Sequence, residues 1–474
     1  MRPLALLVTV FLASAAFGQS ERYELGARLK AFEAEWDKQT DKDARKRALK
    51  DLPQVTTQFF SFQFGNAGKT LDDARFALMS DKPPTDVLRA TSMYPEVKLR
   101  LTSEKEVPVT VKWFYAVKAA EPFGASVRAG FDGKTWTTVD VEKLPMKLTV
   151  PIPESVKRPA DLTLTVEVSV DGKTLASRTV GVTTIEDAAL FLKPELKGVF
   201  PDLGDPDTLA PLERASFNDH VALLRDLAGG TIPESDVQAA KVWATAREIV
   251  KLKEKGKDYF THDRPGDHWV SVPTGEKGKT VTPCRLFVPE KLDPKKPVPL
   301  VVAMHGAGGS ENMFFETYGA GHIVKLCKER GWLLVSPRAG LGFGLTAGPP
   351  VGEIIDELAK RYPVDAKKVF IVGHSMGSGM AFEAVQKYPG KFAAVAGLGG
   401  GGAVRKAEVF ADLPVFIGVG DKDFALRTAK GLQTALEKAK ATKVTYKEYP
   451  DVEHLVIVRE ALGDVFDLFD KLAK

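Results

Sequence analysis

The Gly-His-Ser-Met-Gly pentapeptide at 373–377 contains a serine that could act as a nucleophile. An apolar run at 368–372 precedes it, and a helix-like segment at 378–388 follows it. A serine on so tight a strand-to-helix turn needs small residues two positions before and after it, so that strand and helix can approach closely. Its hydroxyl then lies at a helix N-terminus, where the helix dipole favours negative charge. The pattern predicts Ser375 as a catalytic nucleophile.

A nucleophilic serine needs a base that takes its hydroxyl proton, and an acid that orients this base. When the serine lies on such a strand–turn–helix junction, the partners follow in the order serine, acid, histidine. His454 is the only histidine that follows the pentapeptide. It lies between a strand-like run at 444–449 and a helix-like segment that begins near residue 456. This elimination predicts His454 as the base.

The acid should lie at the end of the preceding strand, where the run 415–420 leads into Asp421 and Asp423. Both aspartates are candidates. We favour Asp423, because the usual arrangement is a glycine, two residues and then the acid, and Gly420 fits this frame. Asp421 would then accept hydrogen bonds from backbone N–H groups of the turn.

An oxyanion hole needs two backbone N–H donors, one of them directly after the nucleophile. Met376 occupies that position, and the second donor should come from a loop after an earlier strand. The His-Gly-Ala-Gly-Gly loop at 305–309 follows an apolar run and has the glycines that let a backbone N–H turn inward. We expect Ala307 to be the second donor, with Gly308 as the alternative, and His305 to hold the shape of the loop.

The elements that must position these residues read as alternating strands and helices. Helix-like segments separate most of the apolar, strand-length runs at 299–304, 332–336, 369–372, 392–398, 415–419 and 444–449. Alternation of this kind predicts an α/β fold with a doubly wound, mostly parallel sheet that has helices on both faces. We assign this domain to residues 265–474.

The residues before this domain divide into four further segments by pattern. Residues 1–18 resemble a signal peptide, because a positive start, an apolar stretch and a small-x-small site precede Gln19. Residues 19–94 have helical spacing, and residues 186–264 read as a second helical region or linker. Between them, residues 95–185 alternate apolar and polar positions and contain an Asp-Gly pair at 171–172 that suits a hairpin turn. We therefore expect a small immunoglobulin-like β-sandwich at 95–185.

The signal peptide implies that the mature protein is secreted or periplasmic. Its apolar stretch is shorter than the roughly 20 residues that span a bilayer, and no later segment is long and apolar enough, so stable membrane insertion is not expected. Export permits a disulfide between Cys284 and Cys327, but we favour two buried thiols.

The composition is that of a globular protein, with 474 residues, 44% hydrophobic residues, 27% charged residues and a net charge of +4. The sequence contains no basic block of the kind that indicates a nucleic-acid partner. No glycine-rich stretch resembles a phosphate loop, and no Cys/His cluster has metal-ligand spacing. We therefore expect neither a cofactor nor a metal. The sequence does not indicate an oligomeric state.

Three motifs together carry a resemblance to a known family: the loop at 305–309, the Tyr-Pro-Val-Asp lead-in at 362–365, and the strand and pentapeptide at 369–377. Together they resemble the α/β-hydrolase superfamily and, more narrowly, secreted esterases of the polyhydroxybutyrate depolymerase and feruloyl or acetylxylan esterase group. The likeness covers about 265–474.

The resemblance implies a nucleophile, an acid, a base and two oxyanion donors, which fall on Ser375, Asp423, His454, Ala307 and Met376. One departure is the serine at position 378, where the group usually has glycine. Because serine is small, we expect no loss of function.

The favoured function is a secreted serine hydrolase that cleaves carboxylic esters through an acyl-enzyme. The interval between Leu398 and Pro414 is too short for a helical lid, which favours small soluble esters or polymer-linked esters as substrates. One alternative is a serine peptidase that resembles the prolyl oligopeptidase group, although no propeller-like repeat is present. Another is a non-catalytic glycan-binding protein with a vestigial hydrolase domain, against which the three intact triad positions argue. The sequence does not name the acyl or alcohol part of the substrate.

Overall fold

The computed structural model describes residues 19–474 except 80–83, 119–122, 132, 134, 194–207 and 340–347. The expected signal peptide at 1–18 lies outside the described residues. The chain divides into two compact units that each combine several stretches of sequence. Unit 1 is Met1–Phe32, Gln54–Gly204 and His220–Glu248, and unit 2 is Glu33–Pro53, Asp205–Asp219 and Ile249–Lys474. The five-part linear division expected from the sequence stays a prediction.

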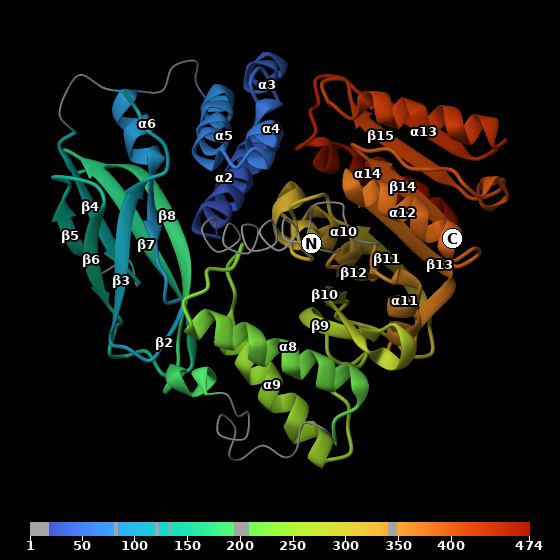
Figure 1. The fold of residues 1–474 in the computed structure, drawn as a ribbon, viewed down its shortest axis with the longest axis horizontal. Coiled ribbons are helices and arrows are strands. Elements are labelled where there is room, and N and C mark those ends of the chain that lie inside the picture. Colours follow the sequence, from blue (N-terminus) through green and yellow to red (C-terminus); the bar gives the residue numbers. More distant parts are fainter. Residues whose placement is uncertain are drawn as a thin grey trace, which may run out of the picture. The chain divides into compact units, whose positions relative to one another are not determined.

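Unit 2 contains an eight-stranded sheet with the order β16-β15-β14-β13-β11-β12-β10-β9 (Figure 1). The six strands from β11 to β16 pair in parallel, and β9 and β10 form an antiparallel edge. The six apolar runs of the sequence correspond to these six parallel strands. The predicted α/β class with a mostly parallel sheet is therefore confirmed. The bounds are β9 Gly266–Thr274, β10 Thr280–Val288, β11 Val298–Met304, β12 Leu333–Pro337, β13 Val364–His374, β14 Ala394–Leu398, β15 Val415–Gly420 and β16 Val444–Tyr449.

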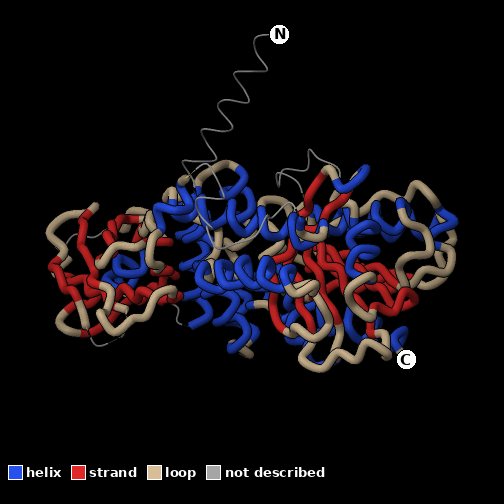
Figure 2. The backbone as a smooth tube through the Cα atoms, turned by 90° about the horizontal axis from the view of Figure 1, so that it is seen from below, coloured by secondary structure: helices blue, strands red, loops and turns tan. Residues whose placement is uncertain are grey.

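Helices alternate with the parallel strands and border the sheet (Figure 2). Helix α14 packs on β13, β14 and β15 through an apolar face that repeats every three to four residues, and Phe469 of this helix stacks on Phe370 with 4.5 Å between ring centroids. No helix among the described residues is long and apolar enough to cross a membrane. The bounds are α3 Lys42–Ala48, α10 His322–Arg330, α11 Val351–Ala359, α12 Met376–Lys387, α13 Leu426–Lys438, α14 Ile457–Ala473, η3 Glu276–Gly278, η4 Met313–Thr317, η5 Tyr318–Ala320 and η6 Ala407–Phe410.

Three helices contribute residues to both units: α2 (Gln19–Lys38), α8 (Pro211–Ala228) and α9 (Ala239–Glu254). Within unit 2, the last turns of α2 reach α14, where the indole N–H of Trp36 donates to Glu460 at 2.7 Å. The first turn of α8 carries Glu213, which accepts two hydrogen bonds of 3.1 Å from Arg361. Unit 2 therefore includes two segments that lie far before its sheet in the sequence.

Unit 1 contains a three-stranded sheet, β1-β3-β6, and a five-stranded sheet, β2-β8-β7-β4-β5. Buried residues of both sheets, among them Val109 and Val166, form one apolar cluster. The Asp171-Gly172 pair forms the tight turn between β7 and β8, and both residues have positive φ, as a two-residue hairpin requires. The bounds are β1 Met93–Glu96, β2 Leu101–Thr102, β3 Glu106–Trp113, β4 Ala125–Gly130, β5 Thr137–Asp140, β6 Met146–Pro151, β7 Ala160–Val170 and β8 Lys173–Thr184.

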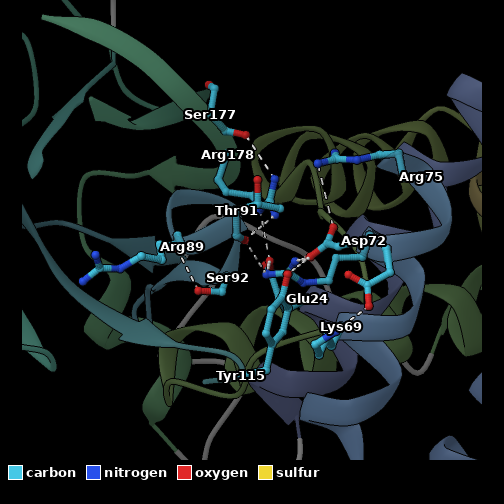
Figure 3. A network of polar contacts seen from close by, with 12 residues as sticks. Glu24, Lys69, Asp72, Arg75, Arg89, Thr91, Ser92, Tyr115, Ser177 and Arg178 are labelled. Atoms are coloured by element: carbon cyan, nitrogen blue, oxygen red, sulfur yellow. Dashed lines mark hydrogen bonds and ion pairs between the residues drawn. The ribbon is translucent and has the colours of Figure 1, made fainter. Parts of the chain in front are cut away.

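A buried network of charged side chains joins the helices of unit 1 to its strands (Figure 3). Its centre is Arg28 of α2, which pairs with Glu24 and with Asp72. Tyr115 donates to Asp72 at 2.8 Å, and Arg178 of β8 pairs with Glu24 at 3.1 Å. Each buried charge thus has an opposite charge beside it, as charges away from water require. The remaining elements of unit 1 are α4 Gln54–Phe60, α5 Phe64–Met79, α6 Thr85–Ser92 and η1 Ala188–Leu192.

Both cysteines are free and buried, as the favoured alternative predicts. Burial raises the pKa of the Cys284 and Cys327 thiols, so both stay protonated.

Candidate active site

Ser375 lies on the tight turn between β13 and α12, with φ 55° and ψ −118°. This left-handed conformation is strained for a residue with a side chain. A Cβ on Gly373 would lie 2.0 Å from the carbonyl oxygen of Gly377, and a Cβ on Gly377 would lie 2.0 Å from that of Met304. The two glycines of the pentapeptide therefore allow strand, turn and helix to meet, and Ser375 is left half-buried at the helix N-terminus.

Ser378, the departure from the esterase pattern, fits without displacing the turn. Its hydroxyl donates to the carbonyl oxygen of Gly401 at 2.9 Å. A Cβ on Gly397 would lie 2.4 Å from the Ser378 hydroxyl, so the glycine in β14 makes room for it. The extra oxygen of serine is thus satisfied and accommodated.

The structure brings Ser375, His454 and Asp423 together. His454 Nε2 lies 3.0 Å from Ser375 Oγ, and His454 Nδ1 lies 2.9 Å from Asp423 Oδ1. Because an ionised carboxylate can only accept, Nδ1–H donates to Asp423 and Nε2 is free to accept the serine proton. His454 and Asp423 are each 4% exposed. The arrangement can move a proton from the serine to the imidazole while the carboxylate holds the ring.

The loop after β15 brings Asp423, and not Asp421, into contact with the imidazole. Asp423 Oδ1 also accepts from the backbone N–H of Ala425 at 2.7 Å. Asp421 instead contacts Lys422 at 3.1 Å, and its own backbone N–H donates to Tyr449 at 3.0 Å. Of the two candidate acids, only Asp423 contacts the histidine.

The loop after β11 passes directly beside the serine, since a Cβ on Gly306 would lie 3.3 Å from Ser375 Cβ. The backbone N–H of Ala339 donates to His305 Nε2 at 2.9 Å, so the other ring nitrogen, Nδ1, carries the proton and donates to the Gly306 carbonyl oxygen at 2.8 Å. Across a trans peptide the carbonyl and the next N–H point in opposite directions. The N–H of Ala307 therefore points away from the His305 ring.

Burial lowers the pKa of His305, so this histidine is a neutral structural group. The second predicted donor, Met376, is the first residue of α12, and its N–H has no acceptor within the helix. Met376 thus follows the nucleophile directly, and Ala307 lies on the loop that passes beside it.

The structure adds two residues that the sequence did not indicate. His374 is fully buried and contacts both Tyr318, at 2.9 Å, and the carbonyl oxygen of His454, at 3.1 Å. Burial, followed by the neighbouring His454, lowers the pKa of His374 well below its usual value. His374 therefore stays neutral while His454 takes up a proton. The ring of Tyr318 packs edge-on to His374, with 4.8 Å between centroids.

Two neighbours of the triad complete the site. Glu453 is wholly buried, and burial raises its pKa to about 7, although it accepts from the backbone N–H of Leu455 at 2.7 Å. Phe424 follows the acid directly and is 60% exposed, with its ring centroid 4.2 Å from that of His454. The imidazole thus has a buried acid behind it and an exposed aromatic ring beside it.

The interval between β14 and β15 contains only the short helix η6 among its elements, and all its residues are described. It therefore holds no helical lid, as the sequence predicts.

Comparisons with known proteins concern the part of the chain that contains this site. Residues 299–443 match the family model described as alpha/beta hydrolase fold. A bifunctional acetylxylan esterase/xylanase of Neocallimastix patriciarum is 28% identical over 147 residues, which are 30% of this chain and 21% of that protein. The chain therefore spans about a fifth of the length of this relative.

Two solved structures show the extent of the structural likeness. A ferulic acid esterase is 16% identical, covers 44% of this chain and 100% of its own, and has a TM-score of 0.38. A thermostable esterase is 17% identical, covers 80% of this chain and 97% of its own, and has a TM-score of 0.39. The match of residues 299–443 and the strand order of the sheet that contains them show that this part of the chain has the alpha/beta hydrolase fold.

Proposed function

We propose that this chain is a serine hydrolase that cleaves carboxylic esters, with Ser375 as nucleophile, His454 as base and Asp423 as orienting acid. One observation carries the proposal: the continuous hydrogen-bonded path from Ser375 Oγ through the His454 ring to Asp423, at 3.0 and 2.9 Å. A surface histidine would not be 4% exposed and pinned on both ring nitrogens by these two partners. The strained φ of Ser375 is the kind of backbone outlier that clusters at functional sites.

The reaction follows from the positions of the protons. Ser375 Oγ attacks the ester carbonyl carbon while its proton passes to His454 Nε2, and the carbonyl electrons move to the oxygen. The N–H groups of Ala307 and Met376 stabilise this oxyanion. When the carbon–oxygen bond to the alcohol breaks, His454 returns the proton to the leaving oxygen, and an acyl-enzyme remains. Water, deprotonated by His454, then releases the acid by the same steps in reverse.

The proposed substrates are small or polymer-linked esters. The site lacks a helical lid in the β14–β15 interval, and the similar proteins are named as acetylxylan and ferulic acid esterases.

We further propose that the protein is exported, with residues 1–18 as its signal peptide, and that the two sheets of unit 1 form an immunoglobulin-like sandwich. Their common apolar cluster and the mainly antiparallel pairing support the sandwich.

A burst experiment tests the function. We expect wild-type protein to release p-nitrophenol from p-nitrophenyl acetate in a burst followed by steady turnover, because the acyl-enzyme forms before it is hydrolysed. Ser375→Ala should abolish the burst, whereas the exposed Thr434→Ala on α13 should retain it. If the correctly folded wild-type protein turns over no acetyl, feruloyl or hydroxybutyrate ester, the proposed esterase activity is wrong. Preferential cleavage of a proline-containing peptide would instead favour the peptidase.

A further inference from the structure

Proton assignments on His374 define a directional chain of hydrogen bonds beside the triad. The carbonyl oxygen of His454 can only accept, so His374 Nε2 carries the proton and donates to it at 3.1 Å. His374 Nδ1 must then accept, so the Tyr318 hydroxyl donates to it at 2.9 Å. The Tyr318 oxygen in turn accepts from the backbone N–H of Gly306 at 3.2 Å. Every proton in this chain has one possible position.

This chain ties together three loops that follow three different strands. Gly306 precedes the expected oxyanion donor Ala307 on the loop after β11, His374 precedes Ser375 on the turn after β13, and His454 lies on the loop after β16. The loops are closely packed here, since a Cβ on Gly306 would lie 3.1 Å from both the Tyr318 hydroxyl and His374 Nδ1. One hydroxyl group therefore contacts both the oxyanion loop and the histidine that holds the base loop.

Tyr318 itself is held by a strained turn. Residues Gly319, Ala320 and Gly321 have positive φ values of 56°, 50° and 75°, and alanine adopts this conformation only at a cost. The carboxyl group of Glu33, near the end of α2, accepts from Ala320 N in this turn at 3.3 Å. Burial raises the pKa of Glu33 well above its usual value, which favours the neutral carboxyl group.

Glu33 is 2% exposed, so its carboxyl group is itself a buried element of unit 2. The same end of α2 is fixed to α14 through Asp37 and Arg459, whose contact is 2.5 Å. The turn that carries Tyr318 is thus attached to a helix that begins near the N-terminus.

We propose that Tyr318 is a positioning residue of the active site, which sets the oxyanion loop and, through His374, the main chain of His454, and that Glu33 of α2 holds Tyr318 in place. This inference rests on the proposed function, since it assigns Tyr318 a role in support of the triad. Tyr318 does not touch the reacting atoms, and its effect is exerted on turnover through the geometry of groups that do.

Tyr318→Phe tests the proposal, because it removes only the hydroxyl. The matched control is Tyr388→Phe, since the Tyr388 hydroxyl is buried without a hydrogen-bond partner among the described residues. We expect kcat for p-nitrophenyl acetate to fall about 10- to 100-fold in Tyr318→Phe, with KM within about threefold of wild type. Tyr388→Phe should match wild type in both. A kcat of Tyr318→Phe within twofold of wild type would overturn the proposal.

The part played by α2 is tested by a pair of substitutions at one position. Glu33→Gln keeps an oxygen acceptor for the turn, and Glu33→Leu does not. We expect Glu33→Gln to retain wild-type kcat and Glu33→Leu to lose about as much as Tyr318→Phe. The double variant Glu33→Leu/Tyr318→Phe should lose little more, because both changes act on one path. Additive losses, or equal activity of the two Glu33 variants, would overturn the link to α2.

A readout without turnover separates this proposal from the proposed function. With ¹⁵N-labelled histidine, NMR should show His374 as the neutral Nε2–H form and should show the ring signals of His454 shifting in Tyr318→Phe but not in Tyr388→Phe. If the wild type hydrolyses no ester, the proposed function fails, and these signals still decide the positioning. Unchanged His454 signals in Tyr318→Phe would overturn it.

Discussion

The two buried polar networks, one in each unit, differ in the kind of group they bury. The network of unit 1 consists of full charges, with Arg28 enclosed by Glu24 and Asp72. The network beside the triad joins two neutral groups, Tyr318 and His374, to the main chain of His454, whose ring contacts the carboxylate of Asp423.

This difference matters because buried full charges must stay paired, whereas neutral groups joined by directional hydrogen bonds can fix the positions of neighbouring loops. Burial lowers the pKa of Arg28 only to about 10, so its guanidinium stays charged at neutral pH. The first network can therefore stabilise a fold, and the second can also position the groups of the triad.

The largest expected effect is on the catalytic side of the comparison. His454→Ala should lower kcat for p-nitrophenyl acetate at least ~10³-fold, because His454 Nε2 is the group beside Ser375 Oγ that can take its proton. Circular dichroism should show that the variant is folded, and the half-buried His262→Ala serves as a control for the loss of a histidine. A loss of less than tenfold would contradict the role of His454 as base.

The two candidate acids should separate clearly. Asp423→Asn should lower kcat by roughly 10²- to 10⁴-fold, because the amide no longer fixes the imidazole in the tautomer that accepts from Ser375. Asp421→Asn should stay within about threefold of wild type, since Asp421 contacts Lys422 and not the histidine. Steady-state kinetics of the two variants decides the assignment, and equal losses would show that it is wrong.

In the charged network, Arg28→Met should lower the free energy of unfolding by about 3–5 kcal/mol, because Asp72 and Glu24 both lose the buried guanidinium between them. Urea unfolding followed by circular dichroism measures this loss, while kcat per folded molecule should not change. The double variant Arg28→Met/Asp72→Leu should recover part of the stability, since an apolar pair removes the unpaired charge. If Arg28→Met is as stable as wild type, the network does not stabilise unit 1.

Glu453 should make stability depend on pH. Its pKa of about 7 in the folded protein lies above the usual value of 4.5, so folding favours the protonated form. The stabilisation is fully present below pH 4.5 and is lost as the pH rises to about 7, by roughly 3 kcal/mol at most. Urea unfolding should therefore give Glu453→Gln and wild type similar stability at pH 4.5, and a more stable variant at pH 8. The exposed Glu437→Gln is the control, and parallel pH profiles of wild type and Glu453→Gln would refute the prediction.

The smallest effect should come from one neutral member of the charged network. Tyr115→Phe removes the hydroxyl that donates to Asp72 at 2.8 Å and should cost about 1–2 kcal/mol of unfolding free energy. Its counterpart Tyr318→Phe should act mainly on kcat, so the two tyrosines give the sharpest form of the comparison. A lower kcat in Tyr115→Phe would contradict the expected difference between the two networks.

The sequence could predict those features that depend on local pattern. Six strands were visible as apolar runs, because buried parallel strands are apolar on both faces. The turn at Ser375 could be predicted because Gly373 and Gly377 flank it. The structure leaves no room for a Cβ at either position. The antiparallel strands β9 and β10 were missed, since threonines, prolines and charged residues interrupt their apolar residues.

Contacts between distant residues could not be read from pattern. The positions of Ser375, Asp423 and His454 followed from the order of elements, but Tyr318 reaches His374 across 56 residues that no spacing rule connects. The exposed Phe424 beside His454 was adjacent to a predicted residue and still gave no signal, because an aromatic residue after a strand is usually part of a core.

The interleaved make-up of unit 2 limits how the hydrolase part of this chain could be excised or exchanged. A fragment that begins at residue 265 would lack Glu33–Pro53 and Asp205–Asp219, which belong to the same compact unit as the sheet. It would leave Glu460 and Arg361 without Trp36 and Glu213. Recombination at that boundary should therefore give insoluble protein, and a fusion partner for this hydrolase would have to be inserted between segments rather than joined at their edge.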